Sequence, residues 1–310
     1  MESTSPASQP SVQALENGGS TPVAERTTEE LAALLPFPAK DANKYTRGKL
    51  TLVVGSAAYP GAACLAAAGA QRTGAGYTEV FCAGKSMITV RAWRPSLVVR
   101  DWRTWQPAHL EAPKPGHPIA CVIGCGFDTT DRAQEPLLMQ TLRAFPGPVL
   151  VDGGALGLLA SQTGLRLAKA RGATELPLVL TPHGGEAVRL AKAARLPTFE
   201  DPQQQAAALA TTYQATVALK GPITYIATPN GTVEPMTRGT AALAKAGTGD
   251  VLAGIIGALL AQGLKPEDAA ALGTALHAEA GKAAANDLTE ISVEAEDIPT
   301  YLPQAIKNLL

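Results

Sequence analysis

Four short apolar segments, each followed by a polar loop that carries glycine, constrain the fold of this chain more than any other feature. They are residues 50–54, 120–123, 149–151 and 178–180. A helix-forming stretch at residues 62–73 follows the first, which gives a strand, loop and helix unit. Runs this apolar are typical of strands buried on both faces of a parallel sheet. We therefore expect an α/β fold whose loops meet at the carboxyl edge of the strands, where such sheets bind ligands.

The sheet is expected to end in antiparallel strands. Two strand-like runs at residues 217–220 and 223–227 precede Asn230-Gly231, a dipeptide that strongly favours a hairpin turn, and residues 232–234 form the return strand. The remaining helix-forming stretches are residues 202–213, 251–262 and 266–285.

Composition bounds the class of protein. The 310 residues are 46% hydrophobic, which is enough for a sizeable core, and the formal net charge is only −1. Such a charge gives no general attraction to nucleic acid, and the longest apolar run is shorter than the about 20 residues of a membrane span. Four cysteines without paired spacing are typical of reduced thiols. We expect a cytoplasmic protein that acts on small molecules and binds neither nucleic acid nor membrane.

The chain is expected to form one domain after a short tail. Residues 1–26 are rich in Ser, Thr, Pro, Gly and Glu and lack the basic start and apolar centre of a signal peptide. We predict a disordered tail at residues 1–26 and one α/β domain at residues 27–310.

The motif Gly247-Thr248-Gly249-Asp250 precedes a strongly apolar helix and predicts an anion site. Two glycines around a small residue allow a tight turn that aims free N–H groups of Gly247, Thr248 and Gly249 at a ligand, and the helix dipole adds positive charge. Asp250 then stands where a base could act, and the dipole is expected to lower its pKa so that it is ionised at neutral pH. The alternative is a helix-capping carboxylate.

Two further loops carry candidate polar groups. His183 and Glu186 stand three residues apart at a strand-to-helix junction, where His183 could contact substrate and Glu186 could orient magnesium-bound water. The same spacing is that of a capping box, and the two interpretations weigh about equally. Lys220 ends a strand before Gly221-Pro222 and could place a phosphate, although such a lysine is more often solvated.

Two other strand ends are ambiguous. Asp152 follows the strand at residues 149–151 and could be functional or structural. Gly124-Cys125-Gly126 resembles the start of a dinucleotide fingerprint, but Thr129 stands where the third glycine belongs, so we interpret it as a turn. Together the glycine loops, the late Gly-x-Gly-Asp and the carboxylates favour phosphoryl chemistry with Asp250 as base.

In order along the chain, these motifs resemble the ribokinase-like superfamily and, within it, the ADP/ATP-dependent NAD(P)H-hydrate dehydratases, the YjeF C-terminal-domain family. The resemblance covers about residue 44 to the C-terminus. The Lys44 to Gly48 motif and the motif at residues 181–186 separate this family from sugar kinases. The segments that carry it are residues 44–48, 55–63, 72–76, 124–126, 181–186, 220–221 and 247–254.

The resemblance implies a ribokinase-like three-layer sandwich that repairs hydrated nicotinamide cofactor. It implies a lyase that uses ADP, or ATP, and Mg²⁺ to convert (6S)-NADHX or (6S)-NADPHX to NADH or NADPH, with AMP and phosphate released. Asp250 is then the base, and Glu186 assists magnesium through water. The implied hydrate-site residues are Ala62, Gly126, His183 and Asp250. The implied nucleotide-site residues are Lys220, Gly221, Pro222, Ile223, Thr224 and Gly249.

The resemblance also has departures and implied partners. Asp152-Gly153-Gly154 replaces an Asp-Ala-Asp-type segment, and Ala244-Lys245-Ala246 replaces a glycine-rich run. The epimerase domain often fused to this family is not expected in residues 1–43, so a separate epimerase is implied, as is a homo-oligomer, a tetramer by family likeness. The alternative function is a ribokinase-like kinase for a vitamin-precursor alcohol.

Overall fold

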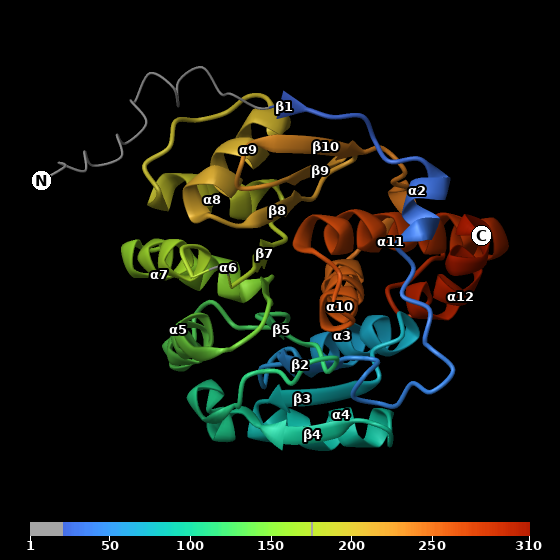
Figure 1. The fold of residues 1–310 in the computed structure, drawn as a ribbon, viewed down its shortest axis with the longest axis horizontal. Helices are drawn as coiled ribbons and strands as arrows, with labels where there is room; N and C mark the ends of the chain where they lie inside the picture. The colour runs from blue at the N-terminus through green and yellow to red at the C-terminus, as the bar shows by residue number, and fades with distance from the viewer. Residues whose placement is uncertain (1–20, 175) are drawn as a thin grey trace, which may run out of the picture.

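The computed structural model describes residues 21–174 and 176–310, which form one mixed sheet flanked by helices (Figure 1). The strands lie side by side in the order β1-β10-β9-β8-β7-β6-β5-β2-β3-β4. Their bounds are β1 Thr21–Pro22, β2 Lys49–Val53, β3 Tyr77–Cys82, β4 Val98–Asp101, β5 Ile119–Ile123, β6 Val149–Val151, β7 Leu178–Leu180, β8 Thr216–Leu219, β9 Thr224–Ala227 and β10 Thr232–Met236.

The sheet is parallel from β8 to β4, and β9 is antiparallel to both of its neighbours. This confirms the predicted parallel sheet with antiparallel strands toward one edge. The predicted turn is also present, since Asn230 accepts a hydrogen bond from the Thr232 N–H on its side-chain oxygen at 3.0 Å and Gly231 has a φ of +88°.

Helices cover both faces of the sheet and give the predicted three layers (Figure 1). Alternate side chains explain this, because Val122 of β5 joins one hydrophobic core and its neighbours Cys121 and Ile123 join the other. The helix bounds are α2 Thr28–Ala33, α3 Pro60–Arg72, α4 Met87–Trp93, α5 Glu135–Ala144, α6 Gly154–Leu159, α7 Gln162–Gly172, α8 Gly184–Ala193, α9 Pro202–Tyr213, α10 Thr248–Ala261, α11 Pro266–Leu288 and α12 Ile298–Leu309.

The helix α10 is enclosed by protein. It packs against α3, α11 and β5, and its residues from Val251 to Ala261 are all buried. The approach to α3 is so close that a Cβ atom on Gly254 would lie 2.0 Å from the Ala66 carbonyl oxygen. Glycine is therefore required there, and this packing fixes the position of the first turn of α10.

Residues 21–26 of the predicted tail lie within the described part of the chain and make defined contacts. The tail predicted for residues 1–26 falls outside the described residues as far as residue 20, but Thr21–Pro22 already pairs with β10. Arg26 follows, and its N–H donates to Glu234 at 2.9 Å. Composition had suggested disorder here because a two-residue strand leaves no periodic signal. Among the helices in the described part of the chain, none is long and apolar enough to cross a membrane.

Candidate active site

The predicted loops do meet at one edge. Since β2, β5, β6, β7 and β8 are consecutive parallel neighbours, the loops that follow them share the carboxyl end of the sheet. Backbone hydrogen bonds tie neighbouring loops together: the Gly55 N–H donates to the Cys125 carbonyl at 2.9 Å, and the Lys220 N–H donates to the Pro182 carbonyl at 2.8 Å. The site is therefore built on rigid elements.

The first turn of α10 opens toward this edge. Gly247 is the N-terminal cap residue, with a φ of +92°, and the Thr248 hydroxyl donates to the Leu243 and Lys245 carbonyls within the loop. The Thr248 N–H also faces the Lys245 carbonyl, at 3.5 Å. In the described residues, the N–H groups of Gly249 and Asp250 donate no hydrogen bond. The Gly247 N–H likewise donates no hydrogen bond among the described residues, so of the predicted donors only Thr248 is engaged within the loop, and Asp250 adds a further available N–H.

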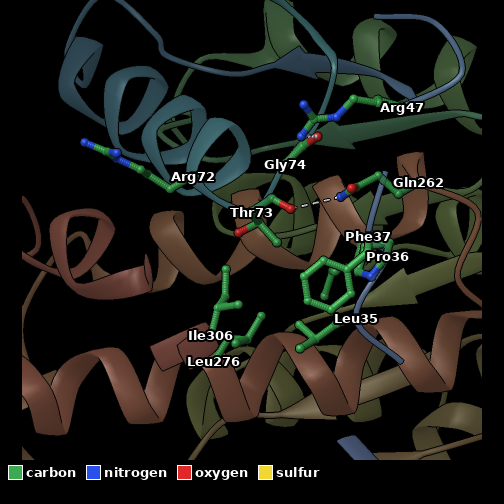
Figure 2. Close-up of a pocket in the computed structure, with 11 residues that line it drawn as sticks. Leu35, Pro36, Phe37, Arg47, Arg72, Thr73, Gly74, Gln262, Leu276 and Ile306 are labelled. Atoms are coloured by element: carbon green, nitrogen blue, oxygen red, sulfur yellow. Dashed lines mark hydrogen bonds between the residues drawn. The ribbon is translucent and has the colours of Figure 1, made fainter. Parts of the chain in front are cut away.

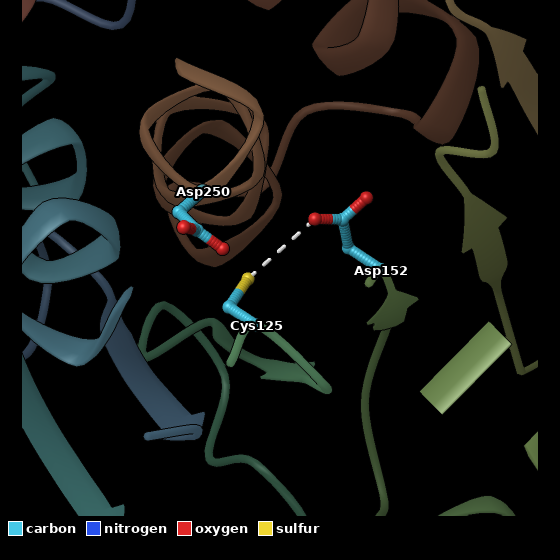
Figure 3. A group of neighbouring side chains, drawn as sticks. All are labelled: Cys125, Asp152 and Asp250. Atoms are coloured by element: carbon cyan, nitrogen blue, oxygen red, sulfur yellow. Dashed lines mark hydrogen bonds between the residues drawn. The ribbon is translucent and has the colours of Figure 1, made fainter. Parts of the chain in front are cut away.

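Asp250 does not cap the helix. It is the third residue of α10, and no side-chain cap bond is made at this end. Its carboxylate instead faces the Asp152 carboxylate and the Cys125 thiol, and one ligand atom from each lies within 4.8 Å of the others (Figure 3). The geometry therefore favours the functional interpretation over the capping alternative.

The expected protonation of Asp250 is wrong. Burial and the nearby Asp152 carboxylate raise the pKa of Asp250 from 3.8 to about 7, although the Lys220 ammonium and the Cys125 thiol act to lower it. The helix dipole is outweighed, because desolvation of a carboxylate and a second negative charge both favour the neutral form. Near neutral pH, both the protonated and the ionised form of Asp250 are therefore populated.

Lys220 is not a solvated strand-end lysine. Its ammonium donates to the Asp152 carboxylate at 2.8 Å, and the two side chains are 21% and 3% exposed. A Cβ atom on Gly249 would lie 3.4 Å from the Lys220 Nζ, so the ammonium reaches the open turn of α10. Burial acts to lower the pKa of Lys220, but the Asp152 and Glu186 carboxylates raise it above its ordinary value. The ammonium is therefore a fixed positive charge in the site.

Asp152, which the sequence left ambiguous, is at the centre of the site. It is buried, and its Oδ1 accepts hydrogen bonds from the Thr181 hydroxyl at 2.7 Å and from Lys220. Its Oδ2 faces Cys125. An aspartate directly after an apolar strand was the only sequence signal for this role.

The capping interpretation of His183 and Glu186 is confirmed. The His183 Nδ1 accepts from the Gly185 N–H at 3.0 Å, and the Glu186 Oε2 accepts from the His183 N–H at 2.8 Å, which is a complete capping box at α8. Both residues nevertheless lie at the site edge, because His183 pairs with Lys220 across neighbouring strand ends. The His183 side chain is 58% exposed and thus accessible to a ligand.

The other predicted site residues are also placed at this edge. Ala62, in the first turn of α3, meets Gly126, where a Cβ atom would lie 2.5 Å from the Ala62 Cβ. Gly126 has a φ of +66°, so glycine is required there for both reasons. Exposed residues 221–223 continue from Lys220, and Thr224, buried, begins β9.

One buried residue near the site was missed. His277 of α11 is 7% exposed, its Nε2 has no partner in the described chain, and burial lowers its pKa to about 4. Its hydrogen bond to the Thr248 backbone opposes that shift, which places the ring behind the α10 turn. A lone histidine in an apolar helix gives no sequence signal that separates it from the core.

The Lys44 to Gly48 motif lies away from these residues. Arg47 donates to the Gly74 carbonyl at 3.2 Å beside a cavity of about 190 Å³, and Gln262 donates to the Thr73 carbonyl at 3.0 Å (Figure 2). Gly48 meets the Ala261 carbonyl at the far end of α10, about 16 Å along the helix from Asp250. This motif therefore packs the opposite end of the α3 and α10 pair.

Comparison with known proteins agrees with this arrangement. A family model described as NAD(P)H-hydrate dehydratase matches residues 50–304. The ADP-dependent (S)-NAD(P)H-hydrate dehydratase of Neisseria meningitidis is 35% identical over 263 residues, which cover 83% of this chain and 86% of the relative. The Bifunctional NAD(P)H-hydrate repair enzyme Nnr of Moorella thermoacetica is 35% identical over 283 residues, which cover 89% of this chain and 52% of the relative. The chain thus spans about half the length of such bifunctional relatives.

Solved structures agree on the fold. The ADP/ATP-dependent NAD(P)H-hydrate dehydratase from Bacillus subtilis, co-crystallised with ATP and Mg²⁺, superposes with a TM-score of 0.78 at 27% identity and covers 93% of this chain and 99% of its own. A ribokinase-like superfamily protein from Enterococcus faecalis gives a TM-score of 0.73 at 24% identity, covering 92% and 96% of the two chains. The chain therefore has a ribokinase-like fold and belongs to the NAD(P)H-hydrate dehydratase family.

Proposed function

We propose that this protein is a hydro-lyase that uses ADP to dehydrate (6S)-NADHX and (6S)-NADPHX, with release of AMP and phosphate. The observation that carries the proposal is the position of Asp250: a carboxylate whose pKa burial raises to about 7 stands beside the Lys220 ammonium and the free N–H groups of α10. A base, a fixed cation and an anion site are the parts that phosphoryl transfer requires.

The chemistry divides into two steps. Asp250 takes the proton of the hydrate hydroxyl as that oxygen attacks the β-phosphorus of ADP, and the bond from that phosphorus to the AMP oxygen breaks. The carbon–oxygen bond then breaks, phosphate leaves, and a proton is lost from the neighbouring ring carbon as the double bond forms. Phosphorylation matters because it replaces hydroxide, a poor leaving group, with phosphate.

The remaining site residues are assigned to two groups, one for the hydrate and one for the nucleotide. We assign the hydrate to the space bordered by Ala62, Gly126 and His183, and the nucleotide to Gly249 and residues 220–224. Contact between Ala62 and Gly126, and between Lys220 and Gly249, supports these two groups. The Gly249 and Asp250 N–H groups and the Lys220 ammonium would stabilise the negative charge that develops on the transferred phosphoryl group.

Magnesium is proposed at Glu186, through water. Only Oε2 of Glu186 is used in the capping box, so Oε1 is available to a hydrated cation, and oxygen is the ligand that magnesium prefers. The cluster of Cys125, Asp152 and Asp250 does not fit magnesium, because it offers a sulfur and because Lys220 already neutralises Asp152. Bound magnesium would neutralise charge on the phosphate oxygens.

The cellular setting is also proposed. We propose that the protein acts in the cytoplasm as a homo-oligomer, a tetramer by family likeness, and that a separate NAD(P)H-hydrate epimerase converts the R epimer. Four free cysteines support a reducing compartment.

The decisive assay follows recovery of NADH absorbance when the protein is incubated with (6S)-NADHX, magnesium and ADP, with ATP in a parallel arm. Asp250→Asn is expected to bind nucleotide nearly as well and to lose about 10²- to 10⁴-fold in turnover. No recovery by the folded wild type would refute the proposal. Phosphorylation of a vitamin-precursor alcohol without hydrate turnover would instead establish a small-molecule kinase.

A further inference from the structure

The thiol of Cys125 lies between the two carboxylates of the site. Figure 3 shows the three side chains turned toward one another, and the sulfur lies 3.7 Å from the Asp152 Oδ2. They come from three separate elements: Cys125 follows β5, Asp152 follows β6, and Asp250 is in α10. Cys125 is 0% exposed and sits between two glycines with positive φ, Gly124 and Gly126. Its position is therefore set by the backbone.

The thiol acts here as a hydrogen-bond donor. Burial, with the nearby Asp152 and Asp250 carboxylates, raises the pKa of Cys125 well above its ordinary value of 9.0. The sulfur thus keeps its hydrogen at any pH at which the protein works, and a protonated thiol is neither a nucleophile nor a metal ligand. What remains is one weak S–H donor that faces two acceptors.

The two acceptors are not equivalent. The Oδ1 of Asp152 is occupied by Thr181 and Lys220, which leaves Oδ2 for the thiol. Asp250 needs a donor only when it has lost its proton. The charged and titratable groups that act on Asp250 are Asp152, Lys220 and Cys125, while His277 behind the turn is neutral because burial lowers its pKa to about 4. Among these groups, Cys125 is the one that can change its hydrogen-bond partner by rotation about a single bond, Cβ–Sγ.

We propose that Cys125 is a positioning residue whose thiol donates to Asp152 while Asp250 is protonated and turns to Asp250 once that carboxylate is ionised. The thiol thereby stabilises the base form of Asp250 without adding charge to the site. Its catalytic importance rests on the proposed function, but the hydrogen bond itself does not.

The first test is independent of activity. The S–H stretching band of Cys125 is isolated as the infrared difference between wild type and Cys125→Ala. The control is the band of Cys121, a buried cysteine within β5, the strand that Cys125 follows, isolated through Cys121→Ala. The Cys125 band should shift as pH rises through about 7, where Asp250 loses its proton. The shift should vanish in Asp250→Asn, and the Cys121 band should not move. A Cys125 band that ignores pH in the folded protein overturns the proposal.

The second test is the pH profile of kcat/KM for the hydrate. Loss of one weak donor in Cys125→Ala should move the acid limb to higher pH by about 0.5 pH units. Cys125→Ser, which keeps a donor, should restore the limb, and Cys121→Ala should leave it in place. If the acid limb of Cys125→Ala stays at the wild-type pH or moves to lower pH, Cys125 does not stabilise the ionised form of Asp250. If the wild type shows no hydrate turnover, the proposed function fails, and the infrared result still decides the hydrogen bond.

Discussion

Asp250 should contribute a distinct pH dependence to the stability of the protein. Its pKa is raised in the folded state to about 7, from 3.8, so the folded protein holds a proton there that the unfolded chain has lost. Stability falls with rising pH wherever the unfolded chain binds fewer protons. The contribution of the protonated Asp250 is therefore complete below pH 4 and is lost progressively until the pH passes 7.

The magnitude follows from the same values. The difference between 3.8 and about 7, at about 1.4 kcal/mol per pKa unit, corresponds to about 4 kcal/mol over the whole range. Between pH 5 and pH 8 the loss is about 2.5 kcal/mol. Asp250→Asn removes the titration, so this variant should gain stability over wild type by about that amount across the same interval.

Urea unfolding of wild type and Asp250→Asn at pH 5, 6, 7 and 8 measures this difference without substrate. Asp41→Asn, which removes one exposed carboxylate, serves as the control variant. If the difference in unfolding free energy between Asp250→Asn and wild type does not change with pH, then burial and the Asp152 carboxylate do not raise the pKa of Asp250. The assignment of Asp250 as a base poised near neutrality would then be wrong.

Further perturbations test other parts of the site and the fold. The kcat/KM of the proposed reaction should rise with pH through about 7, because Asp250 must be ionised to act as base, and a profile that is flat from pH 5 to 9 contradicts this. Lys220→Met should cost about 3 to 5 kcal/mol in urea unfolding, because Asp152 is left buried without its cation; the double variant with Asp152→Asn should recover part of that loss. Burial lowers the pKa of His277 to about 4, so its contribution to stability is present above pH 6.5 and is lost as pH falls. His277→Leu should therefore reduce the loss of unfolding free energy between pH 7 and pH 4 by up to about 3 kcal/mol. Equal losses in wild type and variant would argue against burial of the His277 ring. In thermal unfolding, Gly254→Ala should lower stability by about 3 kcal/mol or more, because its Cβ would clash with the Ala66 carbonyl oxygen. Gly184→Ala is the control: no atom lies within 4 Å of its added Cβ, so this variant should be neutral or stabilised by up to about 1 kcal/mol.

Several features of the site could be predicted because they are local. A carboxylate in the first turn of α10, a lysine at the end of β8 and a histidine before α8 follow from strand ends and helix starts, which leave short-range patterns. The shared edge followed from parallel pairing alone. By contrast, β3 and β4 were not identified, and Asp152 stayed ambiguous, because burial of a polar strand end depends on neighbours distant in the chain.

Protonation was the clearest case of non-local control. Local reasoning assigned Asp250 a lowered pKa from the helix dipole, but burial and Asp152, which is 98 residues earlier in the sequence, decide the opposite direction. The position of Cys125 beside the Asp152 and Asp250 carboxylates is likewise set by the pairing of β5 with β6 and by the packing of α10 against α3. Neither could be derived from the Gly124-Cys125-Gly126 turn itself.

The sequence by itself determined the parallel sheet, its loop edge, the glycine turn before α10 and the family resemblance, because hydrophobic period and backbone freedom are properties of adjacent residues. Only the tertiary structure decided which of those loop residues face one another, which of them lose water, and hence which proton each one holds. The physical reason is that pKa values and hydrogen-bond partners in a buried site depend on desolvation and on charges brought within a few ångströms by packing. For this protein, that packing joins Asp250, Asp152, Lys220 and Cys125 into one site.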